Sequence, residues 1–194
     1  MNATVGILGY GSLLSDTGEE VMDAHIRTIR DIETPFRVEF ARSSKGRGGA
    51  PTLVPVEEGG APADGVICVV DVSAKRGADV LYRREINKVS SDRRYDPVRA
   101  TNPKSVKVRR LPGFRGIDIV FYTELEADIH PRKGLVLACL AIGSVVRTDK
   151  GWDGISYLID AKRNGVETTL IEEYEAEILR QSVCTSLEEA RQKN

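Results

Sequence analysis

The spacing of apolar residues changes along this chain, and that change limits the folds it can form. Up to about residue 125, short segments alternate apolar and polar residues or form brief apolar runs, which is typical of strands. After that point, a long apolar run and two Ser/Thr-x-x-Glu pairs predict helices. This order differs from the regular alternation of a parallel α/β protein. It predicts an α+β fold with a curved, mixed and mostly antiparallel sheet.

The sequence pattern also places the individual elements. We expect strands at 4–8, 35–41, 52–56, 64–72, 104–111 and 116–124. We expect helices at 18–30, 73–89, 134–146 and 153–164, and further helix starts at Thr169 and Ser186. The run 134–146 is rich in β-branched residues, so a strand is the alternative there. Pro112-Gly113 lies between the last two strands and predicts a hairpin.

The length of the chain predicts a single domain. The 194 residues would form a sheet core at about 3–125 and a C-terminal helical extension at about 133–190. A chain of this size can bury a full hydrophobic core without disulfides or metals. A curved antiparallel sheet can also close on itself, so we expect a small β-barrel flanked by helices.

Charge and cysteine content exclude several classes of function. The formal net charge is -1, so no global field draws the chain toward nucleic acid or an anionic membrane. Cys68, Cys139 and Cys184 lie far apart, and His25 and His130 are the only histidines. We therefore expect neither a zinc site nor a disulfide scaffold, and no metal or other cofactor.

The N-terminal segment predicts a cytoplasmic location. It has no basic stretch, and its apolar start is short and interrupted by glycines, unlike a signal peptide. The longest apolar run, 134–146, spans about 13 residues, too few to cross a bilayer. Reduced thiols are consistent with the cytoplasm.

A glycine-rich loop follows the first predicted strand. Gly9-x-Gly11 begins like a dinucleotide-binding fingerprint, but its third position is Leu14 rather than a small residue. A nucleotide-dependent oxidoreductase would also need a parallel sheet, which the predicted hairpin disfavours. Glycine-rich turns can instead present backbone N–H groups to an anion such as a carboxylate. A tight structural turn without ligand is the remaining alternative.

Glu85 lies on the apolar face of the helix predicted at 73–89. On a helical projection, one face carries Ala78, Leu81, Tyr82, Ile86 and Val89, and Glu85 falls within it. Burial of a carboxylate there would raise its pKa toward neutrality, which suits a general acid or base. A partly buried salt bridge with an arginine of the loop 42–47 is the alternative.

Two segments resemble the γ-glutamylcyclotransferase-like superfamily. The run 7–13 contains Tyr-Gly-Ser-Leu and looks like the family's N-terminal signature. The run 65–72, followed by a helix with Leu-Tyr-Arg-Arg-Glu at 81–85, resembles the strand and helix that carry the family's catalytic glutamate. The resemblance covers about 4–124. It implies a small β-barrel with flanking helices, Glu85 as the catalytic residue, and a cradle for the substrate's α-carboxylate. The backbone residues that it assigns to this cradle are Tyr10, Gly11, Ser12 and Leu13.

The chemistry that this resemblance implies is intramolecular. The α-amine of a γ-glutamyl group attacks its own γ-carbonyl, releasing 5-oxoproline and a free amine or amino acid, and no cofactor is needed. The implied partner is a small γ-glutamyl compound, with neither nucleic acid nor membrane, and the family's assembly states include a homodimer. A binding or regulatory module that kept the fold without turnover is the alternative. The loop 42–49 would serve as a substrate lid or remain a solvated loop.

Overall fold

The computed structural model describes residues 3–102, 104–149 and 151–194, and the chain divides into two compact units. Unit 1 consists of Met1–Glu33 and Asp64–Glu126, and unit 2 consists of Thr34–Ala63 and Ala127–Asn194. The helices expected at about 133–190 thus share unit 2 with a strand pair from the first half of the chain. The predicted single domain stays a prediction.

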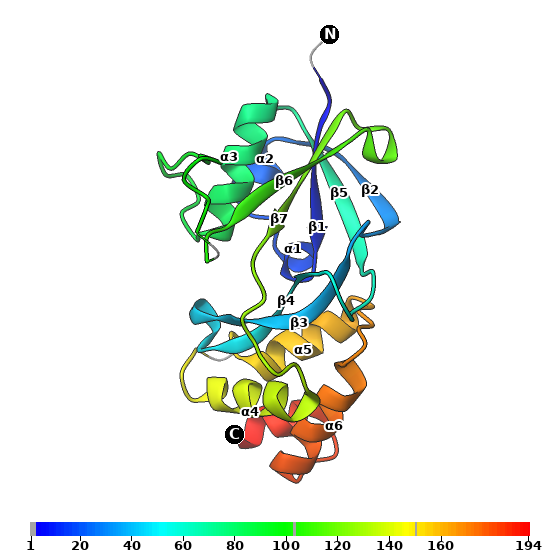
Figure 1. Ribbon diagram of the computed structural model, residues 1–194, viewed down its shortest axis with the longest axis vertical. Coiled ribbons are helices and arrows are strands. Elements are labelled where there is room, and N and C mark those ends of the chain that lie inside the picture. The colour runs from blue at the N-terminus through cyan, green and yellow to red at the C-terminus, as the bar shows by residue number, and fades with distance from the viewer. Residues whose placement is uncertain (1–2, 103, 150) are drawn as a thin grey trace. The chain divides into compact units, whose positions relative to one another are not determined.

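Unit 1 contains a mixed five-stranded sheet. In spatial order the strands are β2 (His25–Glu33), β5 (Asp64–Val70), β1 (Val5–Tyr10), β7 (Ile119–Glu124) and β6 (Lys107–Pro112) (Figure 1). Strand β1 runs parallel to β7, and every other neighbouring pair is antiparallel. All of β1 is buried, which explains why its sequence is an apolar run rather than an alternation. The predicted mixed, mostly antiparallel sheet is confirmed.

The predicted closed barrel is wrong for the described residues. Strands β2 and β6 form opposite edges of the sheet, and each has one neighbouring strand. Strands β3 (Arg37–Ser44) and β4 (Ala50–Val56) pair with each other in a separate two-stranded sheet of unit 2. The sequence pattern identifies strands, but closure depends on which edges meet, and alternation carries no information about that.

The helix predicted at 18–30 is also wrong over most of its length. The helix α2 covers only Glu19–Asp23, and β2 begins at His25. Two register shifts interrupt the pairing of β2 with β5, and Asp31 has a φ of 55°. These irregularities remove the two-residue alternation of a regular strand, so the apolar spacing resembled that of a helix.

Helix α3 (Ala74–Glu85) carries the candidate carboxylate at its last residue. The Ser73 hydroxyl accepts a hydrogen bond from a first-turn N–H and caps the helix start. A Cβ atom at Gly77 would lie 2.9 Å from Cγ1 of Val5, so glycine there lets α3 approach the sheet closely. The helix ends before the predicted 89, and Asn87, with a φ of 52°, no longer has helical geometry.

The predicted hairpin is confirmed between β6 and β7. The two strands are antiparallel, with Pro112 opposite Ile119. The connection begins at Gly113, whose φ of 65° is in the left-handed region that glycine adopts without strain. A short 3-10 turn, Phe114–Gly116, completes the connection. This hairpin brings β7 beside β1, at the centre of unit 1.

Unit 2 combines the β3–β4 hairpin with four helices of the described chain (Figure 1). These are α4 (Gly134–Val145), α5 (Gly154–Arg163), α6 (Ile171–Ser182) and α7 (Leu187–Lys193). The segment 134–146 is therefore helical rather than a strand. Ser186 caps α7 as predicted, whereas the residue before α6 is Leu170 and Thr169 instead donates to the carbonyl of Gly60. Phe40 and Tyr174 pack edge to face, with ring centroids 5.2 Å apart, in the core of this unit.

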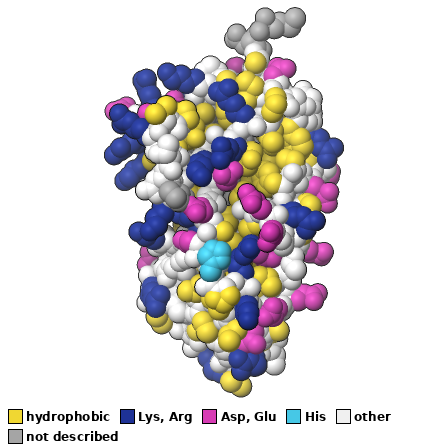
Figure 2. All heavy atoms as spheres, viewed as in Figure 1, with side chains coloured by type: hydrophobic (Ala, Val, Ile, Leu, Met, Phe, Trp, Pro, Cys, Tyr) yellow, Lys and Arg dark blue, Asp and Glu magenta, His cyan; other side chains and the backbone are white. Residues whose placement is uncertain are grey.

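The surface of unit 1 is uneven in charge although the chain as a whole is nearly neutral. Figure 2 shows Lys and Arg side chains gathered where α3 and the loop after it lie. The exposed cations of this region include Lys75, Arg76, Lys88, Arg93 and Arg94. Among the described residues, no helix has the length and apolar character needed to cross a membrane.

Candidate active site

Glu85 is the last residue of α3, and its side chain is 13% exposed. Removal from water raises the pKa of Glu85 above its ordinary value. The charge and hydrogen bond of Arg84, together with a hydrogen bond from Thr123, oppose this shift in pKa. A partly exposed carboxyl with a raised pKa can hold and release a proton nearer neutral pH than an ordinary glutamate can.

Arg84 connects this carboxylate to the glycine-rich turn. Its Nη1 donates to Oε1 of Glu85 at 3.0 Å. Its Nη2 donates to the carbonyl of Asp16 at 2.7 Å and lies 3.5 Å from the carbonyl of Ser12. One guanidinium therefore fixes the end of α3 against the start and end of α1 (Ser12–Ser15). Glu85 is therefore in a salt bridge, but its partner is Arg84 rather than an arginine of the loop 42–47.

Tyr10 and Glu85 meet at Thr123 on β7. The Tyr10 hydroxyl donates to the backbone carbonyl of Thr123 at 3.0 Å, and this contact is buried. The Thr123 side chain hydrogen-bonds the carboxylate of Glu85. The last residue of β1, the penultimate residue of β7 and the last residue of α3 thus lie together.

The turn after β1 has the geometry that glycine permits. Gly11 has φ 54° and ψ −124°, a region that other residues rarely adopt. A Cβ atom at Gly9 would lie 3.3 Å from the Cβ of Leu13, so the turn folds back tightly on the strand. The N–H groups of Ser12 and Leu13 belong to the first turn of α1, where helical N–H groups have no partner within the helix. Leu13 as a whole is 3% exposed, and it packs in the hydrophobic core of unit 1.

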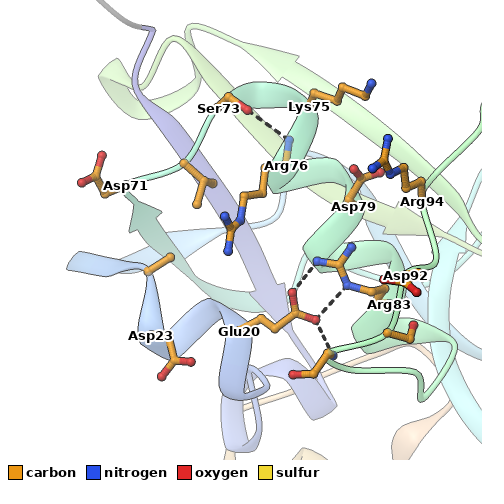
Figure 3. Close-up of a pocket in the computed structure, with 14 residues that line it drawn as sticks. Glu20, Asp23, Asp71, Ser73, Lys75, Arg76, Asp79, Arg83, Asp92 and Arg94 are labelled. Carbon is orange, nitrogen blue, oxygen red and sulfur yellow. Dashed lines mark hydrogen bonds and ion pairs between the residues drawn. The ribbon is translucent and has the colours of Figure 1, made fainter.

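A second ion pair holds the last turn of α3 from another side. Nε of Arg83 donates to Glu20 on α2 at 2.8 Å, and its Nη1 donates to the carbonyl of Arg93 at 2.9 Å. Figure 3 shows Arg83 and Glu20 pointing toward each other within a groove of about 870 Å³. The hydrogen bond from Arg83 is the main cause of the lowered pKa of Glu20. Arg83 lies outside the apolar face of the projected helix, yet it is only 8% exposed.

The structure thus brings the predicted site residues of unit 1 together. Glu85, Tyr10 and the turn at 11–13 are linked through two side chains that sequence reasoning missed, Arg84 and Thr123. A signal for Thr123 existed, since it lies two residues after the buried Phe121 on the same strand face. No pattern identified Arg84, because it lies on the polar side of the projected helix. The functional roles of all these residues stay predictions.

The described residues also bear on cofactor chemistry. No group of three or more His, Cys, Asp or Glu side chains among them is placed to hold a metal ion. The glycine-rich turn does follow β1, but the sheet around it has one parallel pair, β1 with β7. The dinucleotide-binding hypothesis requires a doubly wound parallel sheet, which this is not.

Comparison with known proteins identifies the fold. No protein-family model matches the chain, and no curated protein matches it. Among solved structures, the chain is similar to the crystal structure of a γ-glutamyl cyclotransferase specific to glutathione from yeast. The superposition has a TM-score of 0.51 and covers 98% of this chain and 97% of that one, at 12% sequence identity. The chain shares the fold of that enzyme. At this identity the likeness is one of architecture.

Proposed function

We propose that this protein is a γ-glutamylcyclotransferase-like enzyme, with Glu85 as its general acid and base. It would convert a γ-glutamyl compound into 5-oxoproline and a free amine or amino acid. The observation that carries this proposal is the position of Glu85, a partly exposed carboxylate of raised pKa tied to the turn that follows β1. The fold shared with a yeast γ-glutamyl cyclotransferase supports the same reaction class.

The proposed reaction closes a five-membered ring within the substrate. Glu85 accepts a proton from the α-ammonium group, and the freed amine attacks the γ-carbonyl carbon. The bond from that carbon to the leaving nitrogen then breaks, Glu85 returns the proton to the leaving amine, and the ring nitrogen releases its second proton to solvent. Both reacting groups belong to one molecule, so the main task of the site is to hold a ring-closing conformation.

The turn at 10–13 would provide that hold. The N–H groups of Ser12 and Leu13 would bind the α-carboxylate, beside Tyr10 and Gly11. Arg84 donates hydrogen bonds to the carbonyls of Ser12 and Asp16 and to the carboxylate of Glu85. It would therefore hold the carboxylate-binding turn and the acid-base group in a fixed position relative to each other. Glutathione, on which the yeast protein acts, is the first substrate to test.

A non-catalytic binding module is the second candidate, and the Arg84–Glu85 ion pair favours it. A carboxylate that forms an ion pair with an arginine can have a purely structural role. In that case the turn would still bind a γ-glutamyl compound without converting it.

Measurement of 5-oxoproline release separates the two candidates. We would assay glutathione and a panel of other γ-glutamyl amines and amino acids with the wild-type protein, Glu85→Gln, and the control Glu19→Gln, whose side chain is exposed. The enzyme hypothesis predicts turnover of at least one compound, a loss of about 100-fold or more in Glu85→Gln, and an unchanged rate in the control. Binding without release of 5-oxoproline would support the binding module, and full activity of Glu85→Gln would refute the role of Glu85.

A further inference from the structure

A second pocket, of about 520 Å³, lies in unit 2 beside the loop that joins β3 and β4. One wall is formed by Lys45, Gly46 and Gly48 of this loop. The other wall is formed by residues 146–149 and Trp152, between α4 and α5. The volume is within the range of small-molecule sites. The reaction proposed above uses none of these residues, so the pocket requires its own explanation.

The two walls of this pocket are fixed against each other. Gly48 has a φ of 63°, and a Cβ atom there would lie 2.8 Å from Cγ2 of Thr148 and 3.0 Å from Cβ of Arg147. Only a residue without a side chain can approach the second wall this closely. Thr148 is held in turn, because its hydroxyl donates to the carbonyl of Ser144 on α4 at 3.1 Å. The shape of the pocket is therefore fixed by packing between the two segments that line it.

The aromatic side of the pocket is ordered before any ligand arrives. The guanidinium of Arg47 lies 4.9 Å from the ring centroid of Trp152 and 4.8 Å from that of Tyr157. Tyr157 is 6% exposed, and its hydroxyl accepts the N–H of Leu53 at 3.3 Å. The buried tyrosine thus orients the arginine, and the arginine orients the indole through cation–π contacts. Trp152 remains 53% exposed and lines the pocket, so a ligand bound there can reach this residue.

The polar side of the pocket is positively charged. Lys45 lies on one wall and Arg147 on the other, and neither has a carboxylate partner among the described residues. Arg147 reaches only the carbonyl of Gly48, at 3.5 Å. Among the described residues of the lining, Asp149 is the one with a negatively charged side chain. Two cations that line one pocket and have no carboxylate partner among the described residues are suited to a phosphate group, which accepts several charge-assisted hydrogen bonds.

We propose that this pocket binds a nucleoside monophosphate. The phosphate lies between Lys45 and Arg147, and the base stacks on the exposed part of Trp152. Val146, 78% exposed on the same wall, adds apolar surface for the base or the ribose. This inference assigns a role to the basic glycine-rich loop at 42–49 that the reaction at Glu85 leaves unexplained. It does not depend on the proposed function.

The test compares a complete ligand with its two parts. AMP, adenosine and inorganic phosphate are each titrated into the intact protein by isothermal calorimetry. Trp152 is the only tryptophan of the chain, so its fluorescence locates any binding at this pocket. We expect AMP to bind at least about tenfold more tightly than adenosine or phosphate, with a saturable change in Trp152 emission, because it makes both stacking and ionic contacts.

Substitutions assign each contact. Lys45→Ala and Arg147→Ala should each weaken AMP binding by about tenfold and leave adenosine binding unchanged. Trp152→Ala should weaken AMP binding by about fivefold or more. The exposed residues Lys75 and Arg94 of unit 1 provide charge-matched controls, Lys75→Ala and Arg94→Ala, which should bind as the wild type does.

Three results would overturn the proposal. They are AMP binding no tighter than that of inorganic phosphate, AMP binding without change in Trp152 emission, and unchanged AMP affinity in Lys45→Ala and Arg147→Ala. Circular dichroism of each variant establishes that it is folded. Gly48→Ala is a further variant, since a side chain there should separate the walls and weaken AMP binding without removing any charge.

Discussion

Glu85 of unit 1 and Glu39 of unit 2 are both largely removed from water, but their surroundings are opposite. Glu39 on β3 of unit 2 is 1% exposed. Its Oε1 accepts the Phe40 N–H at 2.9 Å and the Thr168 hydroxyl at 2.6 Å. Its Oε2 accepts the N–H of Leu170, just before α6, at 3.2 Å. The carboxylate therefore lies at a helix N-terminus, where the helix dipole stabilises negative charge.

Glu85 of unit 1 lies instead at a helix C-terminus. It is the last residue of α3, where the helix dipole disfavours an anion. The charged partner of Glu85 is Arg84, and the Glu85 side chain is 13% exposed. Burial alone therefore does not identify a functional carboxylate. A buried glutamate that accepts hydrogen bonds from neutral donors at a helix N-terminus stabilises the fold. A partly exposed glutamate at a helix C-terminus is available to exchange a proton.

The largest effect on stability is expected at Glu39. In Glu39→Gln, an amide N–H₂ replaces one oxygen and faces a donor, so the free energy of unfolding should fall by about 1–3 kcal/mol. Urea denaturation followed by circular dichroism and by Trp152 fluorescence measures this, because Trp152 reports on unit 2. The exposed Glu57 provides the matched control Glu57→Gln. Equal urea midpoints for the two variants would show that the hydrogen bonds of Glu39 do not stabilise the packing of β3 against α6.

A change at Arg84 should alter the pH dependence of catalysis. Arg84 favours the ionised form of Glu85, so Arg84→Met should raise the pKa of Glu85 further. If Glu85 must be ionised to accept a proton, the acid limb of kcat/KM should move to higher pH. Loss of the contacts to the turn should also lower the rate at neutral pH by about tenfold.

The control for this change is Arg109→Met, which breaks the surface pair of Arg109 with Glu124. Its acid limb should coincide with that of the wild type. An acid limb that stays in place in Arg84→Met, or moves to lower pH, would mean that Arg84 does not tune Glu85.

The smallest expected effect is the pH dependence of stability at Glu85. Its pKa is raised above 4.5 by burial, so between that value and the folded pKa the native state binds more protons than the unfolded state. The stability that wild type gains from this proton is present at low pH and is lost as pH rises through the folded pKa. Glu85→Gln removes this dependence, so its stability relative to wild type should increase over the same interval.

Thermal denaturation of the two proteins over that pH range measures the difference. If the free energy of unfolding of Glu85→Gln instead falls relative to that of wild type as pH rises, the pKa of Glu85 is lowered in the folded state, which would contradict the account of Glu85.

Part of this structure could be predicted from local patterns in the sequence. The buried run of β1, the hairpin at Pro112-Gly113 and helix α3 each depend on neighbouring residues, and all were predicted. Glu85 could be selected because a charged residue interrupts an apolar helical face, which is also a local signal.

The features that failed depend on distant contacts or on irregularity. Strand β2 was missed because two register shifts break its alternation. Strand alternation around Val38 and Phe40 would place Glu39 on the opposite face, and its burial comes from distant contacts with Thr168 and the start of α6. The open edge of the sheet and the contact of Arg84 with the turn likewise come from tertiary packing, which no short window of sequence contains.

The most direct test compares the two glutamates in one assay. The initial rate of 5-oxoproline release per folded molecule is measured in Glu85→Gln and Glu39→Gln, with the substrate that the wild type converts best. We predict that Glu39→Gln keeps nearly the wild-type rate while Glu85→Gln loses about 100-fold or more. Similar rates in the two variants would contradict the assignment of Glu85 as the group that moves the proton.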